Sequence, residues 1–94
     1  MKFLNGKVEI NSETLEHIFN NYSLYIYGRD KNDEEMRLKY QERLFEDANI
    51  LALINGLEDD SEEACELYAE IIKVVNKMYI EEYKDDYKAF DLDA

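Results

Sequence analysis

The chain has 94 residues, which suffices for one domain with a single modest core and is too short for two. Its net charge of −12, from 23 acidic and 11 basic residues, argues against direct binding to DNA, RNA or anionic lipid. Hydrophobic residues make up 46% of the chain and there is one cysteine, so we expect a folded domain without an internal disulfide.

The first ten residues predict a short β-hairpin. An Asn5-Gly6 pair stands between two short apolar runs, which is the pattern of a tight two-residue turn. A hairpin of this length is not stable alone, so we expect it to pack on the rest of the domain.

A helix is predicted next, with Asn11 as its N-cap and Ile10 and Leu15 placed as a hydrophobic staple. Residues 23–27 are rich in β-forming side chains and also alternate, so a strand that pairs with the hairpin is the alternative for this segment. The helical stripe runs toward Gly28 and consists of Leu15, Ile18, Phe19, Tyr22, Tyr25 and Ile26.

A loop is expected over residues 28–32, and Asn32 with Glu35 three residues later is typical of the N-terminal cap of a second helix. We expect this helix to run to Asn55, with Gly56 as the left-handed residue after its end and Leu57 folding back on its last turn. Its apolar positions are Met36, Tyr40, Leu44, Phe45, Ala48, Leu51 and Ala52.

Asp60 with Glu63 predicts the cap of a third helix that is long enough to reach Phe90. Its helical stripe consists of Ala64, Cys65, Tyr68, Ile71, Ile72, Val75, Met78, Tyr79 and Tyr83. The fold class that follows is mainly α: a compact three-helix bundle with a short N-terminal β-hairpin, forming a single domain over residues 1–94.

The tyrosines at the end of this third helix allow two interpretations. Tyr79, Tyr83, Tyr87 and Phe90 fall on one side of the helix, where aromatic residues usually complete a core with their phenol groups at its rim. If the last turns project beyond the bundle, the same residues form an aromatic patch for a partner. We expect Tyr79 inside the core and the later residues progressively more available.

The sequence contains no catalytic, cofactor or metal-binding motif. The one histidine, His17, lies off the apolar face of its helix, and no serine or cysteine has another residue to activate it. Three isolated glycines cannot form a phosphate-binding loop, and residues 30–41 lack the glycine and the final glutamate of a calcium loop. We therefore expect no enzymatic activity, no cofactor and no metal.

The acidic residues are concentrated along the chain. No basic residue lies between Arg43 and Lys73, whereas nine acidic residues do. Glu62, Glu66 and Glu70 follow one another at four-residue intervals, where like charges cost a few tenths of a kcal/mol per pair. Because local stability disfavours such pairs, we expect solubility or a partner to explain them. A rigid row of carboxylates can attract a basic protein surface.

In size and charge this chain resembles small acidic phage-encoded nucleic-acid mimics, the anti-CRISPR and anti-restriction inhibitors. The acidic cluster from Glu58 to Glu70 and the acidic tail from Glu81 to Asp93 carry the resemblance. It implies that the target is a CRISPR effector or a restriction enzyme whose basic channel the protein blocks. The residues expected to bind the partner are Glu58, Asp59, Asp60, Glu62, Glu63, Glu66, Glu70, Glu81, Glu82, Tyr83, Asp85, Asp86 and Tyr87.

The alternative is a small helical adaptor or a homodimeric structural protein whose acidity serves only solubility, and whose contact is an apolar helix face. Under both hypotheses the partner is a protein, and neither nucleic acid nor membrane is bound directly. The chain has no signal-peptide pattern and no apolar run near the ~20 residues of a membrane span. We expect a cytoplasmic location, which for a phage protein is the host cytoplasm.

Overall fold

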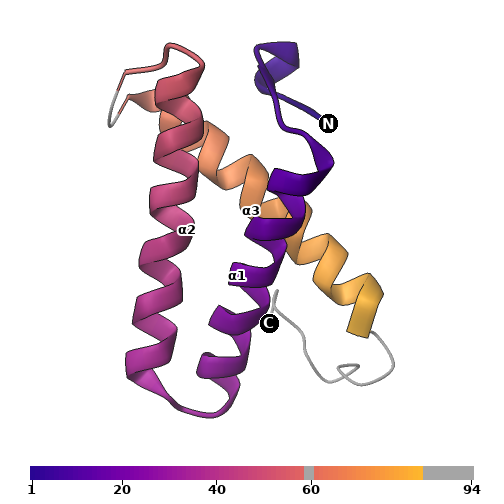
Figure 1. The fold of residues 1–94 in the computed structure, drawn as a ribbon, viewed down its shortest axis with the longest axis vertical. Helices are drawn as coiled ribbons and strands as arrows, with labels where there is room; N and C mark the ends of the chain where they lie inside the picture. The colour runs from indigo at the N-terminus through magenta and orange to yellow at the C-terminus, as the bar shows by residue number, and fades with distance from the viewer. Residues whose placement is uncertain (59–60, 84–94) are drawn as a thin grey trace.

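The computed structural model describes residues 1–58 and 61–83 as three packed helices preceded by a short hairpin (Figure 1). The mainly α fold class predicted from the sequence is therefore confirmed. The elements in chain order are β1 (Lys2–Phe3), the single turn η1 (Leu4–Gly6), β2 (Val8–Glu9), α1 (Ser12–Asp30), α2 (Glu34–Ile54) and α3 (Glu62–Tyr83).

The hairpin turns at Asn5 and Gly6, as predicted. Asn5 has φ 56° and ψ 36°, Gly6 has φ 91°, and the Lys7 N–H donates to the Leu4 carbonyl at 3.2 Å. Positive φ at both central residues is the pattern of a type I′ turn, whose twist matches that of paired strands. The strands pair antiparallel, with Lys2 opposite Glu9 and Phe3 opposite Val8.

Helix α1 begins where the sequence predicts but ends later. The Asn11 side chain accepts from the Thr14 N–H at 2.8 Å, which confirms the predicted cap. The strand alternative for residues 23–27 is wrong, because α1 continues through them to Asp30. Tyr22 and Ile26 are buried one turn apart on the same helix face, and this packing outweighs the β propensity of the segment.

The N-cap of α2 lies one residue later than predicted. The Asp33 side chain accepts from the Met36 N–H at 3.1 Å, so Asp33 and not Asn32 caps α2. Asn32 has φ 55° and forms the left-handed residue of the turn, a conformation that asparagine tolerates better than most residues. Gly28 is helical and lies against the first turn of α2, so the connection is shorter than the predicted loop.

The end of α2 follows the prediction. Gly56 has φ 79°, its N–H donates to Leu53 O at 3.1 Å, and the Leu57 N–H reaches back to Ala52 O at 2.9 Å. This pair of bonds is a Schellman motif. At the start of α3, Ser61 Oγ accepts from the Ala64 N–H at 3.1 Å. The predicted cap at Asp60 and the predicted end at Phe90 lie outside the described residues.

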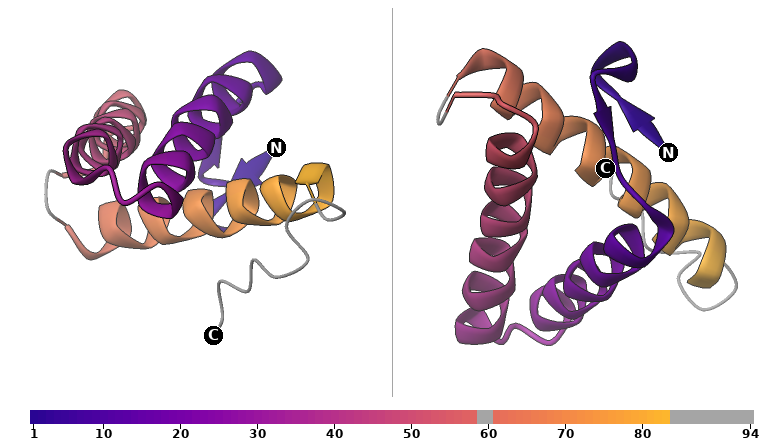
Figure 2. Two further views of the ribbon diagram at one scale, coloured as in Figure 1. Left: turned by 90° about the horizontal axis from the view of Figure 1, so that it is seen from below. Right: turned by 45° about the horizontal axis from the view of Figure 1, so that its top comes forward.

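Helices α1 and α2 form an antiparallel pair with the most extensive helix–helix contact, and α3 crosses both of them (Figure 1). In the right-hand view of Figure 2 the three helices lie along the sides of a triangle. The hairpin packs on α3. None of the described helices is long and apolar enough to span a membrane.

The core joins all the elements. Tyr79 is buried in it, as predicted, and Tyr83 is half-buried, while Tyr87 and Phe90 lie outside the described residues. Leu67 is fully buried although the predicted stripe of the third helix omits it. The core consists of Phe3, Leu4, Val8, Ile10, Ile18, Tyr22, Ile26, Leu44, Ala48, Ala52, Ala64, Leu67, Ile71, Val75 and Tyr79.

Candidate functional site

The predicted acidic cluster lies where α2 ends and α3 begins. Glu58 follows the last turn of α2, and Glu62 and Glu66 lie on successive turns of α3; all three are exposed. Within residues 1–58 and 61–83, none of these three side chains has an ion-pair partner. We call Glu58, Glu62 and Glu66 the acidic corner. Asp59 and Asp60, predicted to belong to it, lie outside the described residues.

Glu63 meets a cation from the hairpin. Lys7 Nζ donates to Glu63 Oε2 at 2.6 Å, and both side chains are largely exposed. The hydrogen bond and the charge of Glu63 raise the pKa of Lys7 above its usual value, with a smaller contribution from Glu66. An exposed pair of this kind adds little stability, but it places one positive charge beside the acidic corner.

Glu70 has a structural contact that the sequence did not predict. Its Oε1 accepts from the Leu4 N–H at 3.0 Å, across 66 positions of sequence. Leu4 has φ 52°, a left-handed conformation that costs a non-glycine residue roughly 1–2 kcal/mol, and its side chain is buried in the core. Glu70 therefore holds the strained turn of the hairpin against α3.

Replacing Glu70 by alanine is expected to destabilise the domain by about 1–3 kcal/mol, because a partly buried N–H then has no acceptor. Glu70→Gln keeps an acceptor oxygen at this position and should cost less than half as much. Urea unfolding followed by circular dichroism measures both changes. Equal effects of the two variants would show that the charge of Glu70, and not the hydrogen bond, matters.

The C-terminal acidic residues form a separate group. Glu81 and Glu82 are exposed in the last turn of α3, about 28 Å from Glu62 along the helix axis. Lys73 and Lys77 are exposed between them, so the acidic residues of α3 do not form one continuous row. The predicted partner residues Asp85, Asp86 and Tyr87 lie outside the described residues, and the Tyr83 ring packs on Tyr79 with centroids 4.7 Å apart.

Sequence reasoning missed an apolar surface on α2. Five large apolar side chains of this helix are 48–73% exposed. Helix α2 thus carries apolar residues on its solvent side as well as on its core side, which is more than a single stripe requires. Exposed charged residues, among them Lys39, Glu42 and Glu46, lie between some of these side chains, and Ile50, Leu53 and Ile54 follow one another most closely. Exposed apolar surface on a small domain often marks an interaction site. This outer face of α2 consists of Leu38, Phe45, Ile50, Leu53 and Ile54.

Phe45 connects this outer face to α3. Its ring stacks on that of Tyr68, with centroids 4.4 Å apart and planes 7° apart. Beside the stack, a small hollow of about 130 Å³ separates α2 from α3. The exposed Cys65 lines it together with Ala48 and Asn49. The outer face therefore ends in a shallow aromatic-lined depression next to the start of α3.

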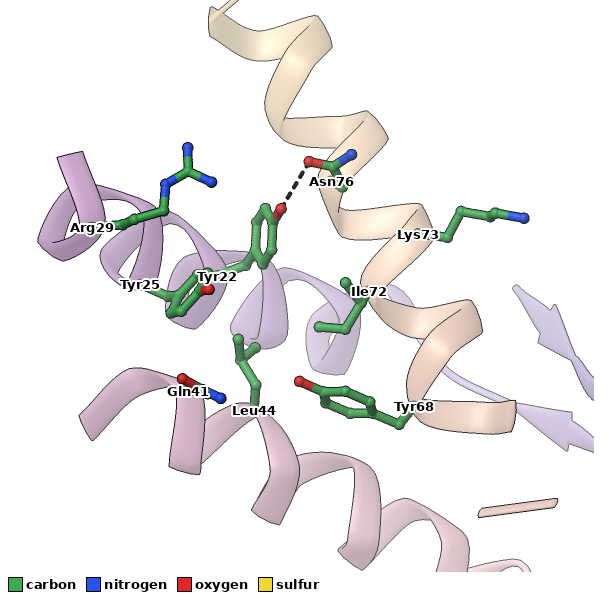
Figure 3. Close-up of a pocket in the computed structure, with 9 residues that line it drawn as sticks. All are labelled: Tyr22, Tyr25, Arg29, Gln41, Leu44, Tyr68, Ile72, Lys73 and Asn76. Carbon is green, nitrogen blue, oxygen red and sulfur yellow. Dashed lines mark hydrogen bonds between the residues drawn. The ribbon is translucent and has the colours of Figure 1, made fainter. Parts of the chain in front are cut away.

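A larger cavity of about 310 Å³ opens where the three helices meet (Figure 3). Burial raises the pKa of Tyr22 to about 12, with the charge of Arg29 acting in the opposite direction, and burial also raises the pKa of Tyr68. The phenol groups therefore stay protonated at neutral pH. The residues that line this three-helix cavity are Tyr22, Tyr25, Arg29, Gln41, Leu44, Tyr68, Ile72, Lys73 and Asn76.

His17 is exposed, as predicted, with its Nε2 3.9 Å from Asp47 Oδ2. The Asp47 carboxylate accepts from the buried Asn21 side chain at 2.9 Å, so it serves the α1–α2 contact. Among the described residues, no group of histidine, cysteine and acidic side chains could hold a metal ion. Comparison of the chain with protein-family models, curated proteins and solved structures gave no match.

Proposed function

We propose that this protein is a non-enzymatic acidic binding protein whose partner carries a basic surface. In its most concrete form, the partner surface is the nucleic-acid-binding groove of a CRISPR effector or of another host defence nuclease. The observation that carries the proposal is the acidic corner. Three exposed carboxylates, at Glu58, Glu62 and Glu66, occupy one end of the domain, with Lys7 as the cation beside them.

The helical placement of these carboxylates suits a basic groove. Side chains four residues apart on a helix are separated by ~6 Å along its axis, so the backbone of α3 sets the spacing of Glu62 and Glu66 before a partner binds. A surface of one sign speeds the encounter with a surface of the opposite sign. Glu63 and Glu70 contact the hairpin, so the carboxylates available to a partner at this end of the domain are those of the acidic corner.

The outer face of α2 offers apolar contact area, which the charges of the acidic corner cannot provide. Leu53 and Ile54 end α2 just before Glu58, so apolar surface adjoins the acidic corner. Protein interfaces combine an apolar centre with a polar rim, and their affinity depends chiefly on a few well-buried anchors. Phe45, stacked on Tyr68 and about half exposed, is such an anchor.

The test compares charge-matched variants of the full chain. Glu58, Glu62 and Glu66 are replaced together by glutamine, and the control variant carries the same change at Glu16, Glu35 and Glu42, which are exposed elsewhere. Each immobilised protein is incubated with a bacterial lysate and with a purified Cas9-type effector. We expect the native protein and the control to retain a nucleic-acid-binding protein that duplex DNA releases, and the corner variant to retain at least tenfold less.

The second measurement is the dependence of this capture on salt concentration. A contact made through several charges weakens steeply between about 50 and 200 mM salt, whereas an apolar contact does not. Capture that resists both salt and DNA, or that is equal for the two variants, would contradict the proposal.

One observation favours a second candidate, a homodimer or adaptor that uses the outer face of α2. Five large apolar side chains are exposed on this one helix, and such exposed apolar surface is typical of a protein–protein contact. The homodimer predicts a solution mass of twice 11.2 kDa, measured by light scattering, that returns to the monomer value in the Phe45→Ser variant. A monomer at all concentrations up to about 1 mM would rule out the homodimer.

A further inference from the structure

The dipeptide Asn-Gly occurs twice in the chain, and in both places it forms a turn. Asn5-Gly6 turns the hairpin, Asn55-Gly56 follows the end of α2, and all four residues are exposed. Asn-Gly is prone to spontaneous deamidation, because glycine has no side chain to shield its backbone nitrogen from the neighbouring amide. The two pairs therefore allow the same reaction to be compared in two environments of one protein.

The reaction needs only water. At the hairpin turn, the Gly6 nitrogen attacks the Asn5 side-chain carbon Cγ, so an N–Cγ bond forms and the Cγ–Nδ2 bond breaks. The proton of the Gly6 N–H leaves with Nδ2 as ammonia, and a five-membered imide ring remains. Water then opens the ring at one of its two carbonyl carbons. The product is an ordinary aspartate or a β-linked aspartate, whose side-chain carbon has become part of the main chain.

Neither turn can react in its native conformation. The ψ angle is 36° at Asn5 and 12° at Asn55. With tetrahedral geometry at Cα, both values place the nitrogen of the following glycine on the side of the Cα–C bond opposite to Cβ. Ring closure requires this nitrogen to lie beside Cβ, so the backbone must rotate first. The rate of each reaction therefore depends on how easily each turn opens.

The turn at Asn55 is held at both reacting groups. The Asn55 side-chain amide donates to Leu51 O at 2.8 Å. The Gly56 N–H, whose nitrogen would attack, donates to Leu53 O at 3.1 Å. Both hydrogen bonds belong to the end of α2, and both must break before the imide ring can close. We therefore expect this pair to react slowly while α2 is folded.

The turn at Asn5 is held less firmly. Within the described residues the Asn5 side chain makes no hydrogen bond, and the turn is closed by the Lys7 N–H, which donates to Leu4 O at 3.2 Å. Leu4 and Asn5 have φ angles of 52° and 56°, which L-residues disfavour, so rotation at Asn5 leaves a strained conformation. The Lys7 side chain pairs with Glu63, but an exposed pair adds little resistance.

We infer that Asn5 is a site of spontaneous deamidation in the folded protein, and that its β-linked product loosens the hairpin from α3. The β-linkage adds one main-chain carbon to a turn whose two sides are anchored in the core by Leu4 and Val8. The pairing of Phe3 with Val8 and the hydrogen bond from the Leu4 N–H to Glu70 both depend on the length of this turn. The site is separate from the acidic corner, so each can fail without the other.

The test compares the two Asn-Gly pairs in the full chain at pH 8 and 37 °C. Trypsin releases Asn5 in the peptide of residues 3–7, which has no other asparagine, and Asn55 in the peptide of residues 44–73. Deamidation raises the peptide mass by one unit, and fragment masses distinguish Asn55 from Asn49. We expect Asn5 to convert at least tenfold faster than Asn55 in the native protein. In urea above the unfolding transition, the two rates should agree within threefold.

A protein isoaspartate methyltransferase, which labels only the β-linked product, identifies that product at position 5. Asn5→Gln should carry no label there. Asn5→Asp reproduces the ordinary aspartate product and should unfold at the same urea concentration as the native protein, because Asp also tolerates the left-handed conformation. The purified β-linked chain should unfold at a lower urea concentration.

Two results would overturn the modification site: equal conversion of Asn5 and Asn55 in the native protein, or conversion of Asn5 only in urea. Equal urea midpoints for the β-linked chain and Asn5→Asp would overturn the predicted loosening of the hairpin.

Discussion

Replacing Leu67 by alanine is expected to lower the free energy of unfolding by about 3–5 kcal/mol. Leu67 is fully buried in α3, and it shares a helix face with Glu63 and Glu70, which both contact the N-terminal hairpin. The lost side chain leaves a cavity between α3 and the hairpin that neither element can fill, because the hairpin turn is already tied to Glu70. Urea unfolding at 25 °C, followed by circular dichroism at 222 nm, measures the change.

Cys65→Ala is the control for this prediction. Cys65 lies two residues earlier in the same helix and is exposed, so its replacement should change stability by less than about 0.5 kcal/mol. If Leu67→Ala does not fold, Leu67→Val gives a smaller cavity and an expected loss of about 1 kcal/mol. A loss below 1 kcal/mol for Leu67→Ala would mean that the hairpin does not cover α3.

Features set by neighbouring residues could be predicted from the sequence. The Asn5-Gly6 turn, the Asn11 cap and the Gly56-Leu57 end of α2 each depend on hydrogen bonds within about six residues, and all three are confirmed. The cap of α2 was misplaced by one residue because Asn32 and Asp33 can both cap a helix. The choice depends on the left-handed turn that Asn32 forms after α1, and therefore on where α1 ends.

Features set by distant contacts could not be predicted. The stripe expected for the third helix included the exposed Cys65 and omitted the buried Leu67, because a helical wheel does not show that a second element covers the other flank. Phe45 matches the apolar spacing of α2, and this spacing does not show whether its side chain is buried or exposed. In the structure the side chain is about half exposed.

The same distinction between features set by neighbouring residues and features set by distant contacts applies to the candidate site. Sequence alone located the run of acidic residues, but it did not show that Glu63 and Glu70 contact the hairpin while Glu62 and Glu66 remain exposed. The three-helix cavity takes its walls from all three helices, and no local pattern brings those positions together. Binding surfaces in this protein thus arise from how the helices cross.

Replacing Gly28 by alanine is expected to destabilise the domain by about 1–2 kcal/mol, although Gly28 is in a helix, where alanine is normally better by about 1 kcal/mol. A Cβ atom at Gly28 would lie 2.9 Å from the Arg37 backbone nitrogen and 3.2 Å from Met36 Cβ. The nearest atom belongs to the backbone, so only a separation of α1 from α2 can relieve the overlap. Overpacking of this kind costs roughly 1–3 kcal/mol, which exceeds the gain in helix propensity.

Two further variants separate these effects. The Cβ atom added by Gly56→Ala would have no atom within 4 Å. The expected loss of about 1 kcal/mol in the free energy of unfolding therefore comes only from the positive φ of 79°. Met36→Ala combined with Gly28→Ala should not restore stability, because the Arg37 nitrogen remains in place. Urea unfolding of the single and double variants gives all three values. A Gly28→Ala protein more stable than the native one would show that α1 and α2 can separate enough to accept the added Cβ atom. The gain in helix propensity would then outweigh the cost of the overlap.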